Sequence, residues 1–247
     1  MRVYGLIGYP LHHSFSKTYF AAKFEREGIK DAVYRNFEIE DIRDFTSLLE
    51  SNRALCGLNV TIPYKRAVIP FLDGLDPHAE TIGAVNTIHF SDGRKTGYNT
   101  DWIGFRQSLE PYLKPYHDKA LILGSGGASL AVQYALKQMR IDFLVVSRSL
   151  GTHHLSYSDL SKDLLKDHRL ILNTTPLGTT PNVESMPPIT LEGIGSKHLV
   201  FDLIYNPPQT RFMIESEKLG AQTLNGYQML VAQAEAAWDI WLHGYQP

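Results

Sequence analysis

Short apolar runs of strand length alternate along the chain with stretches in which apolar residues recur at helical spacing. The apolar runs predict strands, and they lie at residues 3–7, 32–37, 120–123, 143–146, 170–172 and 199–203. Helical spacing is clearest at residues 20, 21 and 24, where Gly28 is a plausible end of the helix, and at residues 128, 131, 132, 135, 136 and 139. This alternation is typical of an α/β fold with mostly parallel sheets.

A further strand is predicted where small polar residues alternate with apolar ones. Leu58, Val60 and Ile62 are expected on one face of this strand, which puts Asn59 and Thr61 together on the other. Pro63 follows directly, so the strand leads into either a turn or a site, and the pattern favours neither.

The order of the predicted elements divides the chain into two domains. A second strand–helix series begins near Lys119, and a last helix carries apolar residues at positions 230, 234, 237, 238 and 241. We predict that residues 1–101 and 226–247 form an α/β domain with a mostly parallel sheet, and that residues 102–225 form a Rossmann-like domain. The chain then crosses between domains twice, which predicts a cleft between them.

A glycine-rich loop lies between a predicted strand and a predicted helix. It consists of Gly124, Ser125, Gly126, Gly127, Ala128 and Ser129. In the dinucleotide-binding pattern the first glycine permits a tight turn and the second lets a pyrophosphate approach the helix N-terminus. Ser129 replaces the third glycine of that pattern and is still small. We therefore predict that this loop binds a dinucleotide cofactor.

The end of the next strand indicates which dinucleotide is bound. An NAD site usually places an acidic residue here, whereas this chain has Ser147, Arg148 and Ser149. An arginine flanked by hydroxyls suits the 2′-phosphate of NADP, because a guanidinium makes charge-assisted hydrogen bonds to phosphate. The alternative is a solvated arginine at a strand end. We predict NADP as the cofactor.

Composition limits the partners, the disulfides and the metal sites that can be expected. The 24 basic and 26 acidic residues leave a net charge of -2, which gives no reason to expect nucleic acid or a membrane surface as partner. No apolar run approaches the roughly 20 residues of a membrane span. Cys56 is the only cysteine of the 247 residues, and CxxC and HExxH patterns are absent, so neither an intrachain disulfide nor a metal site is expected. A cytoplasmic monomer or homodimer is the simplest expectation.

Lys65 and Asp101 are the candidate catalytic residues. Hydride transfer to a ketone requires a proton donor for the developing alkoxide, and a lysine beside a carboxylate is a suitable one. Each candidate also has a structural interpretation: Lys65 as a surface lysine at a helix start, Asp101 as a helix N-cap, and Ser16 as the cap of the first helix.

Several short motifs together resemble the shikimate dehydrogenase family, in matching order and over nearly the whole chain. They are Ser14-x-Ser16, residues 59–65, residues 83–87, Gly97-x-Asn99-Thr100-Asp101, the glycine loop, Asn173-Thr174-Thr175, Asp202-x-x-Tyr205 and Gly226-x-x-Met229-Leu230-x-x-Gln233-Ala234. The resemblance implies a two-domain enzyme that interconverts 3-dehydroshikimate and shikimate with NADP(H), with residues 1–101 and 226–247 holding the substrate.

The resemblance also implies roles for individual residues. Lys65 and Asp101 match the family's catalytic pair. Substrate contacts are implied at Ser14, Ser16, Asn59, Thr61, Asn86, Tyr205 and Gln233, with the two serines holding the substrate carboxylate. Beyond the glycine loop and residues 147–149, cofactor contacts are implied at Asn173, Thr174, Leu203, Gly226 and Met229.

The chain departs from the family pattern at a few positions. It has no second basic residue after Arg148, which predicts a weaker grip on the 2′-phosphate. Lys17 stands where the family generally has proline, and Trp102 follows the catalytic Asp where a small residue is common. A quinate or dual quinate/shikimate dehydrogenase, and a cofactor-binding regulatory module without turnover, are the alternatives.

Overall fold

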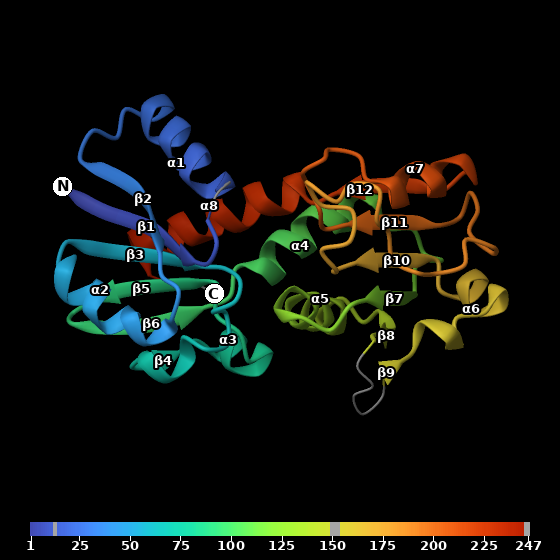
Figure 1. The fold of residues 1–247 in the computed structure, drawn as a ribbon, viewed down its shortest axis with the longest axis horizontal. Helices are drawn as coiled ribbons and strands as arrows, with labels where there is room; N and C mark the ends of the chain where they lie inside the picture. The colour runs from blue at the N-terminus through green and yellow to red at the C-terminus, as the bar shows by residue number, and fades with distance from the viewer. Residues whose placement is uncertain (12–13, 149–153, 245–247) are drawn as a thin grey trace. The chain divides into compact units, whose positions relative to one another are not determined.

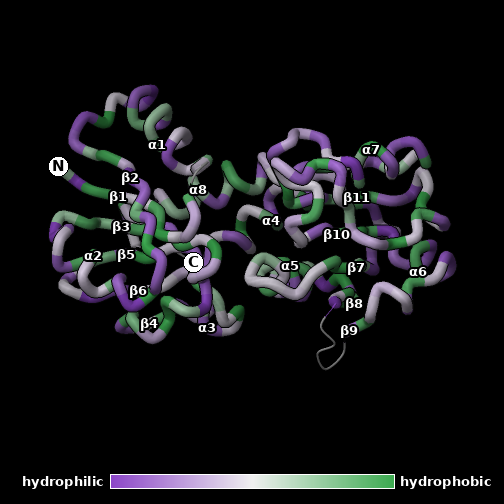
Figure 2. The backbone as a smooth tube through the Cα atoms, in the orientation of Figure 1, coloured by the Kyte–Doolittle hydropathy of each residue, from purple (hydrophilic) through white to green (hydrophobic). Residues whose placement is uncertain are grey.

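The computed structural model describes residues 1–11, 14–148 and 154–244 and divides the chain into two compact units. The first unit consists of Met1–Thr100 with Gln233–Pro247, and the second is Asp101–Ala232. The sequence pattern places the corresponding changes after residues 101 and 225. Figure 2 shows hydrophobic residues in both units, as expected if each builds a core of its own.

The first unit is a six-stranded sheet with helices on both faces (Figure 1). Its elements are β1 (Arg2–Gly8), α1 (Phe15–Arg26), β2 (Ala32–Glu38), η1 (Ile42–Asp44), α2 (Phe45–Ser51), β3 (Leu55–Val60), η2 (Ile69–Phe71), β4 (Gly74–Leu75), α3 (Pro77–Ile82), β5 (Thr87–Ser91), β6 (Arg94–Tyr98) and the later part of α8 (Tyr227–His243). The strand order is β2-β1-β3-β5-β6-β4. β5 is antiparallel to both neighbours and the other pairs are parallel.

Alternation along the strands gives this sheet two buried faces. On one face Val3 and Ile7 pack with Phe45 of α2. On the other, Tyr4 and Leu6 pack with α1 and with the later part of α8, whose contributors to the cluster are Ala234, Ala237, Trp238 and Trp241. Trp241 lies directly over Gly57, where an added Cβ would come within 2.3 Å of its indole nitrogen, and donates to the Ile88 carbonyl at 3.0 Å. The last helix of the chain therefore completes the core of the first unit.

The third strand ends earlier than the alternation predicts. β3 stops at Val60, and Ile62 is 71% exposed rather than on the buried face with Leu58 and Val60. Residues 61–68 form successive turns, which begin with a hydrogen bond from the Tyr64 N–H to the Thr61 carbonyl at 2.9 Å. Pro63 has no N–H to extend the ladder. The prediction for Ile62 was therefore wrong.

The β5–β6 hairpin was not predicted. Its turn is formed by Asp92 and Gly93, which adopt φ values of 51° and 72°. Two successive residues with positive φ are the requirement of a type I′ turn, for which Asp-Gly is a preferred pair. The signal was present in the sequence, but the polar clusters on either side obscured the short strands.

The second unit is a Rossmann-like α/β sheet. Its elements are α4 (Asp101–Leu109), η3 (Glu110–Tyr112), β7 (Lys119–Leu123), α5 (Gly127–Gln138), β8 (Asp142–Val146), β9 (His154–Leu155), η4 (Tyr157–Asp159), α6 (Lys162–Asp167), β10 (Leu170–Asn173), β11 (Leu199–Asp202), α7 (Arg211–Lys218), β12 (Gln222–Asn225) and the start of α8. The strand order is β12-β11-β10-β7-β8-β9, and every pair in it is parallel.

Helices cover both faces of this parallel sheet. Phe105 of α4, Val132 of α5 and Met229 of α8 belong to one buried cluster. Leu165 of α6 and Phe212 of α7 belong to the cluster on the opposite face. The predicted α/β class is confirmed in both units. Among the described residues, every helix is too short or too polar to span a bilayer.

Candidate active site

A buried group of amide and hydroxyl side chains lies on the α1/α8 face of the first unit. We call it the amide–hydroxyl network, and its members are Tyr34, Asn59, Asn86, Thr87, Thr100 and Gln233. Each is at most 7% exposed. Buried polar groups of this kind are tolerated when they are hydrogen-bonded to one another.

Asn86 is at the centre of this network. Its side-chain oxygen accepts from the Thr100 N–H at 2.6 Å and from the Thr87 hydroxyl at 3.2 Å. Its amide group donates to the Thr100 hydroxyl at 3.0 Å and to the Gln233 side-chain oxygen at 3.3 Å. Gln233 comes from α8, 147 residues further along the chain. The fold therefore brings together two residues that the family resemblance implies as substrate contacts.

Tyr34 connects the network to β2. Its hydroxyl donates to the Asn59 side-chain oxygen at 2.7 Å, and its ring stacks on Phe20 of α1 at 4.6 Å. The Asn59 amide in turn donates to the Asn86 carbonyl and to the Thr87 hydroxyl, both at 3.3 Å. Burial raises the pKa of Tyr34, while a hydrogen bond with Ser16 opposes the shift. Tyr34 is thus the neutral donor that orients the Asn59 side chain.

Tyr34→Phe is expected to lower the free energy of unfolding by about 1–3 kcal/mol, because it leaves the buried Asn59 oxygen without its donor. Denaturant unfolding would measure this. Tyr4→Phe is the matched control, because Tyr4 is also buried. When the Tyr4 hydroxyl is lost, its neighbour Arg2 still makes two hydrogen bonds to Asp31, so no buried group is left without a partner. An equal loss for the two variants would contradict the role given to Tyr34.

The first turn of α1 carries both predicted carboxylate-binding serines. Ser14, rather than Ser16, is the N-cap, and its hydroxyl accepts from the Lys17 N–H at 3.2 Å. A proline at position 17 has no N–H for this bond, so the departure at Lys17 gives the helix a cap. Ser16 is the second residue of α1 and contacts the Tyr34 hydroxyl.

Lys65 lies in the turns after β3 rather than at a helix start. Its carbonyl accepts from the Val85 N–H at 2.7 Å, which ties this turn to the segment that precedes β5. Thr61, four residues earlier, has its N–H bonded to the Ile7 carbonyl at 2.9 Å. The side chains of Lys65 and Thr61 are both partly exposed.

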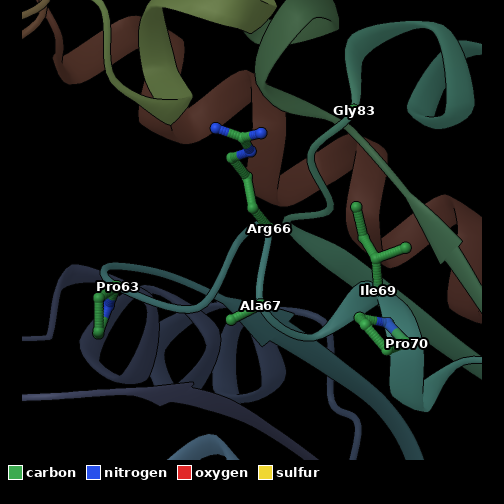
Figure 3. Close-up of a pocket in the computed structure, with 6 residues that line it drawn as sticks. All are labelled: Pro63, Arg66, Ala67, Ile69, Pro70 and Gly83. Carbon is green, nitrogen blue, oxygen red and sulfur yellow. The ribbon is translucent and has the colours of Figure 1, made fainter.

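An open cavity of about 530 Å³ lies beside this segment of the first unit (Figure 3). It is lined by Pro63, Arg66, Ala67, Ile69, Pro70 and Gly83. Apart from the Arg66 guanidinium the lining side chains are apolar, and none of the predicted site residues is among them.

The glycine loop of the second unit has the geometry of an anion-binding helix N-terminus. Gly124 has φ +108° and lies against Thr174, so a side chain there would be both strained and crowded. Gly126 is the N-cap of α5, and no side chain of the described residues caps the helix. An added Cβ on Gly126 would meet no described atom within 4 Å. Gly127 and Ala128, which provide the first N–H groups of α5, are partly exposed.

The strand end expected to select the cofactor is next to this loop. The hydroxyls of Ser125 and Ser147 lie 2.9 Å apart and join the loop to the end of β8. Arg148 follows Ser147. Burial raises the pKa of the Tyr157 phenol, and the positive charge of Arg148 partly opposes this shift. Ser149, also predicted to contact the cofactor, lies outside the described residues.

The other predicted cofactor residues cluster at the carboxyl ends of β10 and β11. The Asn173 side chain accepts from the Thr175 N–H at 3.0 Å and donates to Asp202 at 3.0 Å, and the Thr174 hydroxyl donates to the Leu123 carbonyl at 2.8 Å. The fully buried Asp202 also accepts from the Thr210 hydroxyl at 2.7 Å. Burial raises the pKa of Asp202, and these hydrogen bonds oppose the shift. These contacts fix the shape of the strand ends.

Gly226 allows the start of α8 to approach β11 closely. Its N–H donates to the Ile204 carbonyl at 2.9 Å, and an added Cβ would lie only 2.0 Å from the Leu203 carbonyl oxygen. Met229 and Leu203 then pack in the same cluster. These three predicted cofactor residues are therefore held together by the fold.

Asp101 and Tyr205 belong to the second unit, whereas Lys65 and the other predicted substrate residues belong to the first. Asp101 is the first residue of α4. Burial raises the pKa of the Tyr205 phenol. The Trp102 ring packs edge-on against the ring of Tyr134 in α5, with 5.4 Å between the ring centroids. The bulky residue after Asp101 therefore contributes to the packing of α4 on α5 within the second unit. The pairing of Lys65 with Asp101 stays a prediction.

Some residues of the amide–hydroxyl network and of the strand ends near Asp202 were not predicted from the sequence to have a role. Tyr34 was read only as part of an alternating strand, and Asp202 only as part of a motif. Thr87 and Thr100 belonged to the motifs but were given no role. A signal was present for the threonines, because they directly follow two asparagines, Asn86 and Asn99. Tyr34 had none, since buried tyrosines are common in strands.

The parallel sheet and glycine loop of the second unit place it in the Rossmann-like class of dinucleotide-binding folds. A family model described as the shikimate dehydrogenase substrate binding domain matches residues 6–88. The NADP(+) shikimate dehydrogenase of Methanosphaera stadtmanae is 37% identical over 255 residues, which cover 96% of this chain and 89% of the relative. The chain therefore belongs to the shikimate dehydrogenase family, as its motifs predict.

Solved structures share the fold over all or nearly all of the chain. Shikimate 5-dehydrogenase from Thermus thermophilus, in complex with NADP(H) and shikimate, is 30% identical with a TM-score of 0.88, covering 100% of this chain and 95% of that one. Ligand-free 5-ketofructose reductase from a Gluconobacter species is 28% identical with a TM-score of 0.84, covering 98% of this chain and 92% of that one. The fold is thus shared by proteins named for different ketone substrates.

Proposed function

We propose that this protein is an NADP-dependent dehydrogenase that reversibly reduces 3-dehydroshikimate to shikimate. The observation that carries the proposal is the full-length similarity to the Thermus thermophilus enzyme, whose structure holds both NADP(H) and shikimate. Reduction of this ketone is a step in the synthesis of chorismate and the aromatic amino acids, as the sequence resemblance implies.

The residues of the second unit fit the proposed cofactor. The uncapped start of α5 and the open space at Gly126 suit a pyrophosphate, because helix N-termini stabilise anions. Arg148 supplies a positive charge at the end of β8, where an acidic residue would repel a 2′-phosphate. The bound cofactor supplies the hydride in reduction and accepts it in the reverse reaction.

Lys65 and Asp101 carry the proton chemistry in this proposal. The Lys65 ammonium donates a proton to the developing alkoxide, or stabilises it, and Asp101 orients the ammonium. The short bond from the Val85 N–H to the Lys65 carbonyl supports this role, since it fixes the backbone from which the lysine reaches.

The first unit supplies the contacts to the substrate. Ser14 and Ser16 bind its carboxylate, and Asn59, Thr61, Asn86, Gln233 and, from the second unit, Tyr205 bind its hydroxyls or carboxylate. The amide–hydroxyl network supports these assignments because its hydrogen bonds orient the Asn86 and Gln233 side chains. Such preorganisation lowers the cost of ordering side chains on binding.

Steady-state turnover would test the proposal. Nicotinamide absorbance would be followed with shikimate, quinate and 5-ketofructose, each with NADP(H) and with NAD(H). We expect the highest kcat/KM for shikimate with NADP. A higher value for quinate or 5-ketofructose would overturn the substrate assignment, and tight NADP binding without turnover of any of them would identify a regulatory module. Cytoplasmic location and a monomeric or homodimeric state stay predictions.

Arg148→Asp is expected to lower the ratio of kcat/KM for NADP to that for NAD by roughly 10²-fold. It removes a charge-assisted hydrogen bond to the 2′-phosphate and adds a repulsive charge. The same steady-state assay with both cofactors measures it. Arg140→Asp, at an exposed position after α5, is the matched control and should leave the ratio unchanged. A wild-type preference for NAD would contradict the assignment of the cofactor.

A further inference from the structure

A buried lysine joins α1 to α8 in the first unit. The Lys23 side chain is only 5% exposed, although lysine is among the residues least often buried. Its ammonium lies 2.9 Å from Glu27, the C-cap of α1, and 2.7 Å from Glu235 on α8. The apolar spacing of α1 points to Phe20 and Phe24 and gives no indication of this contact.

Tyr19 completes the contact from the preceding turn of α1. Its hydroxyl donates to one carboxylate oxygen of Glu235, while Lys23 donates to the other. Both oxygens of Glu235 are therefore held by donors four residues apart on one helix face. We call Tyr19, Lys23 and Glu235 the α1–α8 clamp.

Burial and hydrogen bonding keep Tyr19 and Lys23 protonated, so both remain donors. Burial raises the pKa of Tyr19, and its bond to Glu235 adds to the shift, so the phenol stays protonated. Burial acts to lower the pKa of Lys23, but its bonds to Glu235 and Glu27 outweigh this, and the net shift is upward. Lys23 is therefore charged at neutral pH.

Each end of the clamp is close in sequence to a predicted substrate contact. Gln233 precedes Glu235 by two residues, or about 200° around the helix, and its side chain joins Asn86 in the network. On α1, Ser16 lies one turn before Tyr19, and Tyr19 stacks on Phe15 at 5.3 Å. A helix transmits displacement along its axis, so a shift of Glu235 relative to Tyr19 changes the separation of Gln233 from the two serines.

We propose that Glu235, held by Tyr19 and Lys23, is a positioning residue that sets the distance between Ser14 and Ser16 on α1 and Gln233 on α8. This inference rests on the proposed function, in which these residues bind the carboxylate and a hydroxyl of one cyclohexene carboxylate. The clamp fixes the two ends of the substrate site and takes no part in proton or hydride transfer.

A purely structural ion pair is the competing explanation, and the two make different predictions. A purely structural ion pair changes stability alone, and removing the partner of a buried charge such as Lys23 lowers stability strongly. A positioning clamp changes the binding of the substrate, because misplacing one of two simultaneous contacts weakens both. It leaves the cofactor, which is assigned to the second unit, unaffected.

Glu235→Gln tests the clamp, since it keeps the size of the side chain but turns an amide donor toward Lys23. We expect KM for shikimate to rise roughly tenfold, with kcat and KM for NADP within twofold of wild type. Tyr19→Phe, which removes one hydroxyl, should raise KM for shikimate about threefold. The double variant Lys23→Gln/Glu235→Gln, in which two amides can pair, should recover most of the loss.

Asp73→Asn is the matched control, because it breaks another ion pair of the first unit, between Asp73 and Lys95 at 2.9 Å. It should leave every kinetic constant unchanged. A lower melting temperature for Glu235→Gln with unchanged KM for shikimate would overturn the clamp, as would an equal rise in KM for NADP. If Glu235→Gln does not fold, Tyr19→Phe decides on the same constants. Wild-type protein that does not turn over shikimate would instead overturn the proposed function, and the clamp with it.

Discussion

Replacing Lys65 by alanine is expected to lower kcat for shikimate by roughly 10²–10⁴-fold, the usual contribution of one general acid–base group. KM for NADP should stay within twofold of wild type, because the groups assigned to the cofactor are all in the second unit. The fold should be retained, since the lysine side chain is partly exposed and the bond from the Val85 N–H goes to its backbone carbonyl.

Arg66→Ala provides the control for this experiment. Arg66 is the next residue, carries the same charge and lines the open cavity beside the turn, but has no assigned role in catalysis. Its loss should change kcat by no more than about twofold, so a general effect of removing positive charge can be separated from the loss of the proton donor. Activity of Lys65→Ala within a few-fold of wild type would remove Lys65 from the mechanism.

Gly126→Ala is expected to raise KM for NADP by roughly 10- to 100-fold with little loss of stability. The added methyl group meets no described protein atom within 4 Å, and φ at this residue is −79°, which any residue can adopt. The methyl group would instead occupy the space through which a pyrophosphate reaches the start of α5, and a misplacement of about 1 Å is costly in a bound complex. Cofactor titration and thermal unfolding would measure the two effects.

Substitutions of two other glycines in the second unit serve as controls for Gly126→Ala. Gly195→Ala, where the nearest described atom is the Leu219 carbonyl oxygen at 4.0 Å, should leave both stability and KM for NADP unchanged. Gly226→Ala should destabilise the protein, because the new Cβ would lie 2.0 Å from the Leu203 carbonyl oxygen. If Gly126→Ala behaved like Gly195→Ala, the loop would not be the pyrophosphate site.

The sequence predicted most of the sheet framework because the strands of both units are buried apolar runs with helices between them. The runs at 3–7, 32–37, 120–123 and 170–172 are all strands of the structure, and the helix after the glycine loop buries residues 131, 132, 135 and 136 as its spacing predicts. Periodicity was sufficient for β1, β7 and β10 because they are buried on both faces, which constrains side-chain chemistry strongly.

The parts that were missed depend on contacts between residues distant in sequence. Ile62 continues an alternating pattern, but Pro63 and the following turns end the ladder before it. Lys23 looks like a surface lysine until Glu235, 212 residues later, is placed beside it. Tyr34 becomes a donor to Asn59 only when β2 and β3 flank β1 in one sheet. No local pattern encodes these pairings, since each partner alone is an ordinary residue for its position.

The shared helix α8 also has a consequence for the order of biosynthesis. Domains generally fold as they leave the ribosome, amino-terminal domain first. Here Ala234, Ala237, Trp238 and Trp241, which cover Tyr4 and Phe20, follow the whole second unit in the chain. An emerging chain therefore has the complete second unit available while the sheet of the first unit still lacks the cover from α8, so the first unit completes its core only after the second unit has been made.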